Sequence, residues 1–387
     1  MKGLSQFIAL WAVSLLLLAG CADRKPPVIE PPPLEFPALQ AVDWDQLPGW
    51  RQDDLAPAFA AFLRSCPSLR WRDHWRDVCA VAGQVDGADN QQIRGFFEKN
   101  FIPHQVFNAD GTSTGLMTGY YGPELAGSRE PTGEYRYPLY RQPDDMLIID
   151  LAEVYPELGD YRLRGRIEGN RVVPYHDRAA IDYGGEPLTG HELFWVQDPV
   201  ELFFLHVQGS GSIRLPDGEQ VMVNYANQNG HPYRSIGRLL LDRKEMTRDQ
   251  MSMQNIRRWV ADNPEAGRRL LAENPSYVFF RELPPGTESP PGAMGVPLTP
   301  RRSLAVDPRT IPLGAPVFLA TTFPGRDEQP LRQLMVAQDT GGAIKGRVRG
   351  DFFWGMGNAA AEFAGRMKSP GQLWVLLPRT ADIAAVR

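Results

Sequence analysis

The sequence has 387 residues, a formal net charge of -5 and 43% hydrophobic residues. This length exceeds the range in which a single hydrophobic core keeps growing, so we expect two domains. The acidic balance comes without a long basic run, which argues against a nucleic-acid partner and favours a neutral or mixed-charge substrate.

The N-terminus predicts an export signal with a lipid attachment site. Lys2 precedes an apolar run over residues 7–18, which is too short to cross a bilayer as a folded helix. The run ends in LAGC, which resembles the cleavage site of bacterial lipoproteins, so residues 1–20 are predicted to be removed and Cys21 to be lipidated. The alternative is an ordinary secretory signal with a chance cysteine. By resemblance to lipoprotein sorting rules, Ala22 implies periplasmic localisation on the outer membrane.

Residues 21–41 are rich in proline and predict an extended linker. The two remaining cysteines, Cys66 and Cys79, lie in two stretches of helical spacing. An oxidising compartment makes a disulfide between these helices the prediction, with two buried free thiols as the alternative. The cysteines and the scattered histidines have no metal-ligand spacing, so we expect neither a metal nor another cofactor.

Turn and cap signals predict the next elements in chain order. Gly-Asn at 169–170 and Pro-Asp-Gly at 216–218 predict two antiparallel hairpins. Thr247 and Gln250 form a candidate capping box, and Pro264 begins a further helix. Short apolar strands that suit a small barrel come after it, and a last helix is capped by Asn358; the expected strands are 277–280, 303–306, 316–321, 334–338 and 373–377, and the helix is 358–367.

The stretch QDTGGAIKGRVRGDFFWGMG, residues 338–357, contains two acids with three cations between them. Asp339 either caps a turn or belongs to an aspartic-protease tripeptide, and the second hypothesis requires a dimer because no second tripeptide exists. Asp351 either caps a turn or is a general acid whose pKa is raised by the neighbouring aromatic residues. The cations Lys345, Arg347 and Arg349 would oppose that rise if they approached Asp351. Asp307, before a proline, predicts a turn whose carboxylate accepts backbone N–H groups.

Two glycine-rich turns carry groups that suit a carbohydrate. Thr118–Glu124 contains Tyr120 and Tyr121, whose rings can stack on sugars, and 206–211 contains Gln208, Gly209 and Ser210. Ser210 is predicted to bind rather than attack, because its spacing is not that of a nucleophile elbow. His206 is interpreted as a structural group at a strand end, with a catalytic base as the alternative.

Together, several stretches resemble the membrane-bound lytic murein transglycosylase A family, whose members cut bacterial peptidoglycan. The resemblance is carried by the lipoprotein site, 118–123, 204–211, YANQNGHPYRSIG at 225–237, 251–259, 306–314 and 338–357. It implies a mainly β protein with some α: a double-psi β-barrel domain, an inserted second β-rich domain and a glycan groove between them. The expected boundaries are 42–124 with 270–387 for the barrel, and 125–269 for the insert.

The resemblance also implies cleavage between N-acetylmuramic acid and N-acetylglucosamine without water, which leaves a 1,6-anhydromuramoyl end. Asp351 matches the family's catalytic aspartate, and Asp339 would be its close neighbour. The candidate substrate-binding residues are Tyr120, Tyr121, Gln208, Gly209, Ser210, Tyr225 and Lys345. Expected partners are glycan strands, a membrane reached through lipidated Cys21, and other cell-wall enzymes. A non-catalytic wall-binding lipoprotein of the expansin-like barrel type and an aspartic protease are the alternatives.

Overall fold

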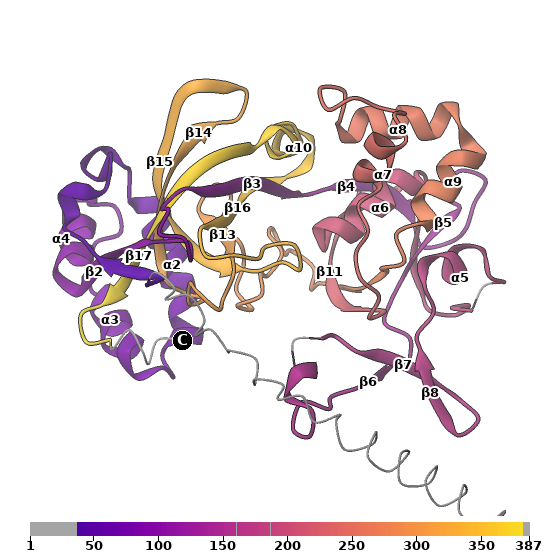
Figure 1. Ribbon diagram of the computed structural model, residues 1–387, viewed down its shortest axis with the longest axis horizontal. Helices are drawn as coiled ribbons and strands as arrows, with labels where there is room; N and C mark the ends of the chain where they lie inside the picture. Colours follow the sequence, from indigo (N-terminus) through magenta and orange to yellow (C-terminus); the bar gives the residue numbers. More distant parts are fainter. Residues whose placement is uncertain (1–36, 160, 186, 382–387) are drawn as a thin grey trace, which may run out of the picture. The chain divides into compact units, whose positions relative to one another are not determined.

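The computed structural model describes residues 37–159, 161–185 and 187–381, so the predicted signal peptide and Cys21 lie outside the described residues. This part of the chain is mainly β with some α, as predicted, and its strands form sheets of eight, six and three strands (Figure 1). No helix within it has the length and apolar character needed to span a bilayer.

The eight-stranded sheet joins the two ends of the described chain. Its order is β1-β2-β17-β14-β15-β13-β16-β3, and β17 also pairs with β3, so the pairings return from β3 to β17. Strand β13 runs parallel to β15 on one side and antiparallel to β16 on the other. The bounds are β1 (Leu39–Ala41), β2 (Phe101–Val106), β3 (Gly115–Gly122), β13 (Ser303–Val306), β14 (Pro316–Phe323), β15 (Arg326–Asp339), β16 (Arg349–Met356) and β17 (Lys368–Pro378).

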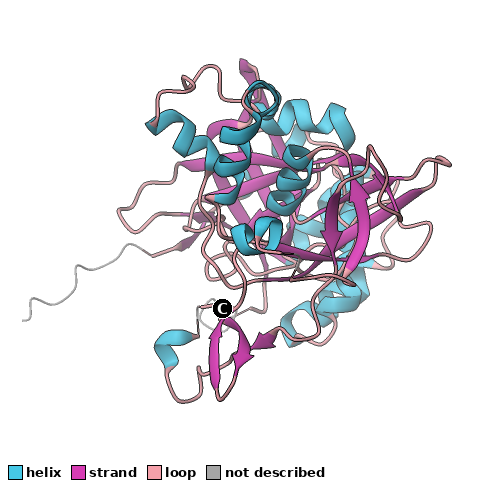
Figure 2. Cartoon of the chain, turned by 90° about the vertical axis from the view of Figure 1, so that its right-hand side faces the viewer, coloured by secondary structure: helices cyan, strands magenta, loops and turns pink. Residues whose placement is uncertain are grey.

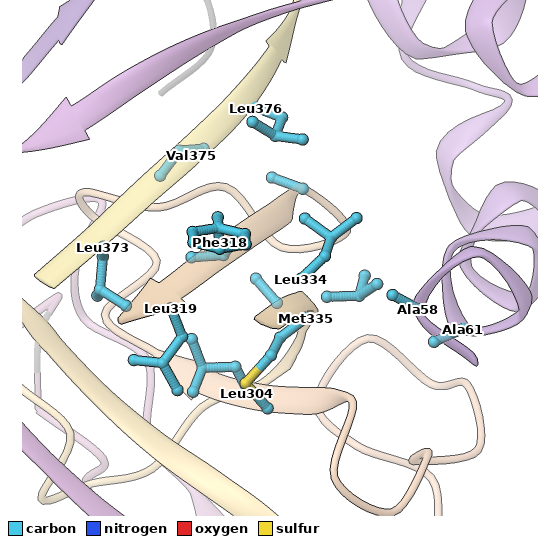
Figure 3. Packing of buried hydrophobic residues seen from close by; sticks show 14 of the residues in the cluster. Ala58, Ala61, Leu304, Phe318, Leu319, Leu334, Met335, Leu373, Val375 and Leu376 are labelled. Atoms are coloured by element: carbon cyan, nitrogen blue, oxygen red, sulfur yellow. The ribbon is translucent and has the colours of Figure 1, made fainter. Parts of the chain in front are cut away.

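A large apolar core fills the space between these strands and the helices that cover them. Side chains of β14, β15 and β17 share one cluster with alanines of the first long helix, as Figure 3 shows for Phe318, Leu334 and Val375. Four consecutive residues of β14, from Pro316 to Leu319, are buried, which is typical of a strand covered on both faces. The helices of this part are α2 (Ala56–Leu69), α3 (Asp73–Ala82), α4 (Asn90–Asn100) and α10 (Gly357–Arg366).

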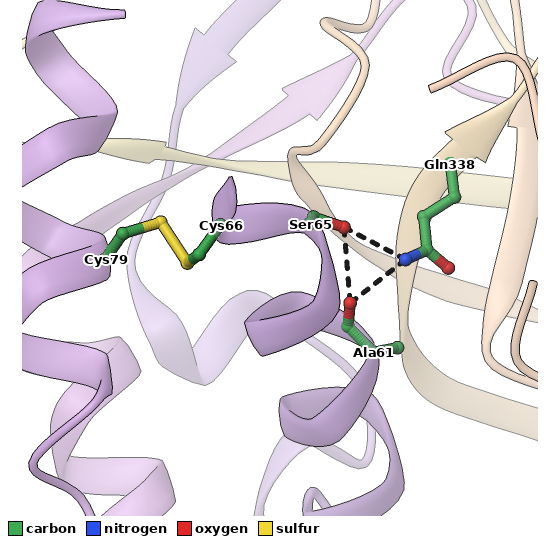
Figure 4. Close-up of a disulfide and its surroundings, with 5 residues drawn as sticks. All are labelled: Ala61, Ser65, Cys66, Cys79 and Gln338. Carbon is green, nitrogen blue, oxygen red and sulfur yellow. Dashed lines mark hydrogen bonds between the residues drawn. A yellow bond between two sulfur atoms is a disulfide. The ribbon is translucent and has the colours of Figure 1, made fainter. Parts of the chain in front are cut away.

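Helix α2 connects a disulfide on one side to β15 on the other. Cys66 of α2 and Cys79 of α3 form a disulfide with a Cα–Cα distance of 5.5 Å (Figure 4). On the side toward β15, the Gln338 side-chain amide donates to the Ala61 carbonyl at 3.0 Å and to the Ser65 hydroxyl at 2.9 Å. Helix α2 is therefore fixed both to α3 and to the residue that precedes Asp339.

Asp53, which precedes α2, and Arg302, which precedes β13, bond to the backbone of β15 at a position that β13 does not reach. Ser303, the first residue of β13, pairs with Val336, so the backbone of Leu334 has no partner in that strand. Instead the Leu334 N–H donates to the Asp53 carboxylate at 2.6 Å, and Arg302 Nη1 donates to the Leu334 carbonyl at 2.8 Å. Asp53 and Arg302 are both buried and paired with each other at 3.2 Å. The ion pair thus takes the place of the missing strand residue.

Residues 124–282 form the two smaller sheets, with apolar clusters of their own. The six-stranded order is β12-β11-β10-β4-β9-β5, and the three-stranded sheet β6-β7-β8 lies apart from the other two in both views (Figures 1 and 2). The strands are β4 (Glu124–Ser128), β5 (Tyr137–Tyr140), β6 (Leu147–Ile148), β7 (Arg164–Glu168), β8 (Arg171–Pro174), β9 (Glu192–Val196), β10 (Ser210–Arg214), β11 (Gln220–Gln228) and β12 (Val278–Glu282). The helices are α5 (Arg178–Tyr183), α6 (Pro199–Gln208), α7 (Ile236–Asp242), α8 (Met253–Asp262) and α9 (Pro264–Ala272).

Several predicted elements are confirmed, and others are corrected. The hairpins at 169–170 and 216–218 are present, and β13 has its predicted bounds. The end of the predicted linker is wrong, because Leu39–Ala41 pairs with β2 as strand β1. The predicted capping box is also wrong: Gln250 Oε1 accepts from the Thr247 N–H, but the helix begins later and Ser252 caps it. The last helix begins one residue before Asn358, which therefore is not its cap.

Replacing Cys66 and Cys79 together with alanine should lower the free energy of unfolding by about 3 kcal/mol. The physical reason is that the cross-link restricts the unfolded chain over a sequence separation of 13. Urea unfolding followed by tryptophan fluorescence measures the difference. Reductant should bring the wild type to the stability of the variant and leave the variant unchanged, whereas equal stabilities under oxidising conditions would contradict the prediction.

Candidate active site

The two acids of the 338–357 stretch lie on either side of one small residue. Ala305 of β13 is the register partner of Asp339 in β15 and also of Asp351 in β16. The register of β13 with β15 shifts between Leu304 and Ala305, so the side-chain contacts define the shared face. Thr118 and Tyr120 are two residues apart on β3 and bond to Asp351 and Asp339, so the two carboxyl groups face the same side of β3. The two aspartate Cα atoms are separated by two strand spacings, or roughly 10 Å. The structure therefore brings together the two residues predicted to be catalytic.

Asp339 is half-buried and accepts three hydrogen bonds from protein groups. Its Oδ1 accepts from the backbone N–H groups of Ala293 and Thr340, both at 2.9 Å, and its Oδ2 accepts from the Tyr120 hydroxyl at 2.9 Å. Burial raises the pKa of Asp339, and these three hydrogen bonds act in the opposite direction. Strand β15 ends at Asp339 as predicted, and the turn that follows lies at 341–344, where the Ile344 N–H donates to the Gly341 carbonyl at 3.0 Å.

Asp351 has fewer donors and an apolar neighbour. Its Oδ1 accepts from the Thr118 hydroxyl at 2.5 Å, and Thr118 is its register partner in β3. Burial is the main cause that raises the pKa of Asp351; the charge of Asp339 adds to the rise, while Thr118 and the charge of Arg349 lower it. Asp351 is half-buried, and a carboxyl with a raised pKa retains its proton to higher pH than a free aspartic acid, which is the property required of a general acid.

The aromatic residue that dries the site is Phe353. It is fully buried and packs against Tyr120 with the two rings tilted by 42° and their centroids 5.1 Å apart. It shares a small apolar cluster with Leu298, Ala305 and Ile344. Phe352 and Trp354 alternate to the other face and pack in the large core. The sequence predicted that one of these three aromatics desolvates Asp351, and the alternation of the strand selects the middle one.

The third acid has a different role. Asp307 Oδ2 accepts from Arg309 Nη2 at 2.7 Å and from the Gly346 N–H at 2.9 Å, and its Oδ1 accepts from Arg309 N–H groups. The hydrogen bonds from Arg309 are the largest cause that lowers the pKa of Asp307 to about 2. Asp307 is thus an ionised anchor for its own turn, as predicted, and for the loop that carries Gly346.

The three cations of the stretch are placed differently. Lys345 is exposed, and Arg347 is half-buried. Arg349 points toward β3, where its Nη2 donates to the Thr118 hydroxyl at 2.7 Å and its Nη1 donates to the carbonyls of Leu116 and Gly350. Arg349 is therefore the cation that interacts with Asp351, and its contact passes through Thr118. Sequence reasoning missed Thr118 and Ala305 because both depend on strand pairing.

The predicted site residues Tyr120 and Tyr121 project to opposite faces of β3. Tyr120 faces the acids, whereas Tyr121 alternates away from them: its hydroxyl contacts Met253 Sδ at 3.2 Å, and burial is the main cause that raises its pKa to about 12. Gln208 is the last residue of α6, and its Oε1 accepts from the Tyr121 N–H at 3.2 Å. Gln208 thereby connects α6 to β3.

Gly209, Ser210 and Tyr225 lie where the end of α6 meets β10 and β11. Gly209 ends α6 with φ of 79°, a conformation that favours glycine. Ser210 begins β10 and is buried, and the Tyr225 N–H donates to the Gly209 carbonyl at 2.7 Å. The predicted glycine-rich turn at 206–211 is therefore a helix end at Gly209 followed directly by β10. The glycine-rich turn predicted at 118–124 is wrong, because Gly115–Gly122 forms strand β3.

His206 lies inside α6 rather than at a strand end, because the apolar run after Pro199 forms a helix capped by Asp198. It is buried, and its Nδ1 accepts from Arg178 Nη2 at 2.8 Å. Burial, together with the Arg178 charge, holds the pKa of His206 well below its usual value. His206 is thus a neutral structural group. No set of His, Cys, Asp and Glu side chains in residues 37–381, leaving aside the undescribed positions 160 and 186, could hold a metal ion.

Comparisons with known proteins agree with this arrangement. Residues 116–281 match the MltA specific insert domain, and residues 302–377, which contain all three acids, match the 3D domain. Membrane-bound lytic murein transglycosylase A of Escherichia coli strain K12 is 36% identical over 299 residues, which cover 75% of this chain and 72% of that protein. The crystal structure of MltA from Neisseria gonorrhoeae, monoclinic form, is 38% identical with a TM-score of 0.79, and the match covers 91% of this chain and 98% of that one. Escherichia coli MltA with bound chitohexaose is 31% identical with a TM-score of 0.63, and the match covers 84% and 90% of the two chains.

The fold therefore belongs to an enzyme of the lytic transglycosylase class. The chain is a member of the membrane-bound lytic murein transglycosylase A family. This membership confirms the family predicted from the sequence, and the wall-binding and aspartic-protease hypotheses are not retained.

Substitution of Asp351 and of Asp307 should change stability in opposite directions. The pKa of Asp351 is raised, so its ionisation opposes folding, and the stability contributed by its neutral form is lost as pH rises through the folded pKa. Asp351→Asn should therefore raise Tm at pH 7 by roughly 2–4 °C, as expected for about 1 kcal/mol.

The pKa of Asp307 is lowered to about 2, so the stability that its carboxylate contributes is present above the unfolded pKa of 3.8 and is lost as pH falls toward 2. Asp307→Asn should lower the free energy of unfolding by about 1–3 kcal/mol at pH 7.

Differential scanning calorimetry at pH 3 and pH 7 tests both changes. The gain in Asp351→Asn should vanish at pH 3, where the wild-type carboxyl is already neutral in both states. A gain of equal size at the two pH values, or a loss at pH 7, would contradict the assigned cause.

Proposed function

We propose that this protein cleaves the β-1,4 bond between N-acetylmuramic acid and N-acetylglucosamine in peptidoglycan without water and forms a 1,6-anhydromuramoyl end. The observation that carries the proposal is the pairing of Ala305 with both Asp339 and Asp351, which places two half-buried carboxyls of raised pKa on either side of one residue. The names of the relatives, lytic murein transglycosylase, support the same reaction class.

Asp351 serves first as acid and then as base. Its carboxyl proton passes to the glycosidic oxygen as the bond from that oxygen to C1 of the muramic acid breaks, and the N-acetylglucosamine leaves with a free C4 hydroxyl. The C6 hydroxyl of the same muramic acid then attacks C1, and its proton returns to the Asp351 carboxylate. The nucleophile comes from the sugar, so one acid replaces the pair that hydrolytic glycosidases use. Intramolecular attack also gains from proximity.

Asp339 supports this sequence as the member of the pair that keeps its charge. It accepts three hydrogen bonds against one for Asp351, and hydrogen bonds to a carboxylate favour its ionised form. A charged Asp339 helps Asp351 to retain its proton and stabilises positive charge that develops at C1. Tyr120 holds the Oδ2 atom of Asp339 in place.

The substrate is a glycan strand that lies in a groove between a double-psi β-barrel domain and an inserted domain, expected at 42–124 with 270–387 and at 125–269. Strand β12 pairs with β11 in the six-stranded sheet, so the inserted domain is extended to Glu282. The apolar clusters formed within residues 125–280 are separate from the large cluster of the eight-stranded sheet, which supports this division. The Escherichia coli relative has been solved with bound chitohexaose, a β-1,4-linked N-acetylglucosamine oligomer, which supports an extended saccharide site. The residues assigned to bind it are Tyr120, Tyr121, Gln208, Gly209, Ser210, Tyr225 and Lys345.

The protein works in the periplasm, attached to the outer membrane through lipidated Cys21, with other cell-wall enzymes as partners. The name of the curated relatives, membrane-bound, supports membrane attachment. Cys21 itself lies outside the described residues.

Asp351→Asn should abolish anhydromuramoyl products while the variant still binds purified sacculi. Asparagine can accept the Thr118 hydrogen bond but has no proton to donate, so turnover should fall by at least about 10³-fold. Mass spectrometry of digested sacculi measures the products, and a pull-down with sacculi measures binding. Wild-type turnover in this variant would exclude Asp351 as the acid, and reducing ends in the wild-type digest would indicate a hydrolase.

Asp339→Asn should lower turnover by about 10–100-fold, because it removes a charge next to the developing positive centre but leaves the proton donor. Tyr120→Phe removes one of the three hydrogen bonds to Asp339 and should cause a smaller loss in the same assay. A loss in Tyr120→Phe larger than that in Asp339→Asn would show that Tyr120 acts on the substrate directly and not through Asp339.

A further inference from the structure

A chain of two hydrogen bonds links Arg349 to the catalytic candidate. Arg349 Nη2 donates to Thr118 Oγ1 at 2.7 Å, and Thr118 Oγ1 donates to Asp351 Oδ1 at 2.5 Å. The guanidinium is held in position by two further donations from Nη1 to the carbonyls of Leu116 and Gly350. Among the described side chains Arg349 makes no direct ion pair with Asp351, so their hydrogen-bonded contact passes through the Thr118 hydroxyl.

The direction of these bonds follows from donor and acceptor chemistry. Arginine has donors only, so the Thr118 oxygen must accept from Arg349. The single proton of the hydroxyl is then directed to its second partner, which is Asp351 Oδ1. An oxygen that accepts from Thr118 cannot at the same time direct a proton of its own along that line. The acidic proton of Asp351 is consequently left to Oδ2.

We propose that Arg349 is a positioning residue that acts through Thr118 to keep the transferable proton of Asp351 on Oδ2. The proposal rests on the proposed role of Asp351 as acid and then base, and it adds the atom from which the proton leaves and to which it returns. We call the hydrogen-bonded series Arg349–Thr118–Asp351 the relay. Without the relay the proton would be shared between the two oxygens of Asp351, and only one of these oxygens can face the glycosidic oxygen in a given pose of the substrate.

The relay also balances the two halves of the reaction. While Asp351 is protonated, the Thr118 bond selects the correct oxygen; once the proton has left, the same bond stabilises the carboxylate that must recover a proton from the C6 hydroxyl. The charge of Arg349 also favours the carboxylate form of Asp351, so a direct contact would lower the pKa of Asp351 further and disfavour the protonated form that the first step requires. Placing a hydroxyl between the two charged groups weakens this effect and preserves the orientation.

The other charged or titratable groups around Asp351 have different positions. Asp339 faces it from β15 and Tyr120 from β3, and the charge of Asp339 acts against that of Arg349. Lys368 of β17 is the register partner of Thr118 but is exposed. On α10, Glu362 and Arg366 pair with each other at 3.1 Å on the surface. Arg349 is the cation with a hydrogen-bonded path to the carboxyl.

Four variants of the full chain test the relay: Thr118→Val, Thr118→Ser, Arg349→Met and the double variant Thr118→Val with Arg349→Met. The readout is the pH dependence of anhydromuropeptide release from purified sacculi. Loss of the hydroxyl or of the guanidinium removes an interaction that favours the carboxylate, so the alkaline limb of the profile should move to higher pH. Maximal turnover should fall by about 10-fold or more in either single variant, because the proton is no longer confined to one oxygen.

The double variant is the decisive comparison. If Arg349 acts through Thr118, the double variant should lose no more turnover than the worse single variant, whereas independent contributions would multiply. Thr118→Ser keeps the hydroxyl and should recover most of the turnover that Thr118→Val loses. Arg366→Gln removes a surface arginine of α10 and should leave the profile of the wild type unchanged.

Multiplicative losses, or an alkaline limb that does not move in Thr118→Val and Arg349→Met, would overturn the relay. Such a result with an inactive Asp351→Asn would leave the proposed function intact, whereas an active Asp351→Asn would reject the proposed function itself. Thermal unfolding of each variant identifies losses caused by misfolding. If Thr118→Val does not fold, Thr118→Ala replaces it as the variant without a hydroxyl.

Discussion

The register of β13 determines the arrangement of the whole site. Ala305 meets Asp339 on one side and Asp351 on the other, while its neighbours Leu304 and Val306 point into the large core. A slip of one residue would move every side chain of β13 to the opposite face, which would expose those two apolar residues. Burial of Leu304 and Val306 therefore fixes the position of Ala305, and the small methyl group of Ala305 leaves space in which two carboxyls interact.

The same alternation along β3 and β16 places residues that contact the acids on one face and residues of the large core on the other. Thr118 and Tyr120 of β3 face the acids, whereas Gly119 between them lies against Trp354, where an added Cβ would approach the indole nitrogen to 2.6 Å. On β16, Phe353 dries the site and Phe352 belongs to the core. The fold thus treats its acids in opposite ways: Asp307 is stabilised as an anion by Arg309, whereas Asp339 and Asp351 are destabilised as anions by burial. Carboxyl groups whose charged form is destabilised in this way are common at sites that perform proton transfer.

Local signals allowed much of this to be predicted from the sequence. The hairpin turns, the bounds of β13 and the turn role of Asp307 depend on neighbouring residues, and the sequence was sufficient for each. Interactions between distant residues were not accessible in this way. Thr118 and Asp351 are 233 positions apart, and no property of either residue predicts that β3 and β16 pair in parallel. The assignment of His206 to a strand end failed for a related reason: its apolar run fits a buried helix or a strand equally well, and Asp198 decides in favour of a helix.

The helical layer at the start of the described chain has a consequence for the site that no local pattern reveals. Asp53 and Arg302 hold Leu334 where β13 is absent, and Ala61 and Ser65 hold the side chain of Gln338, which immediately precedes Asp339. Strand β15 is thus supported by contacts with a segment, Asp53 to Ser65, that lies far earlier in the chain. A half-buried carboxyl pair that opposes folding requires a rigid support, since a flexible strand would allow Asp339 to turn toward water and lose its influence on Asp351. The disulfide of α2, though remote from the acids, contributes to the rigidity of that support.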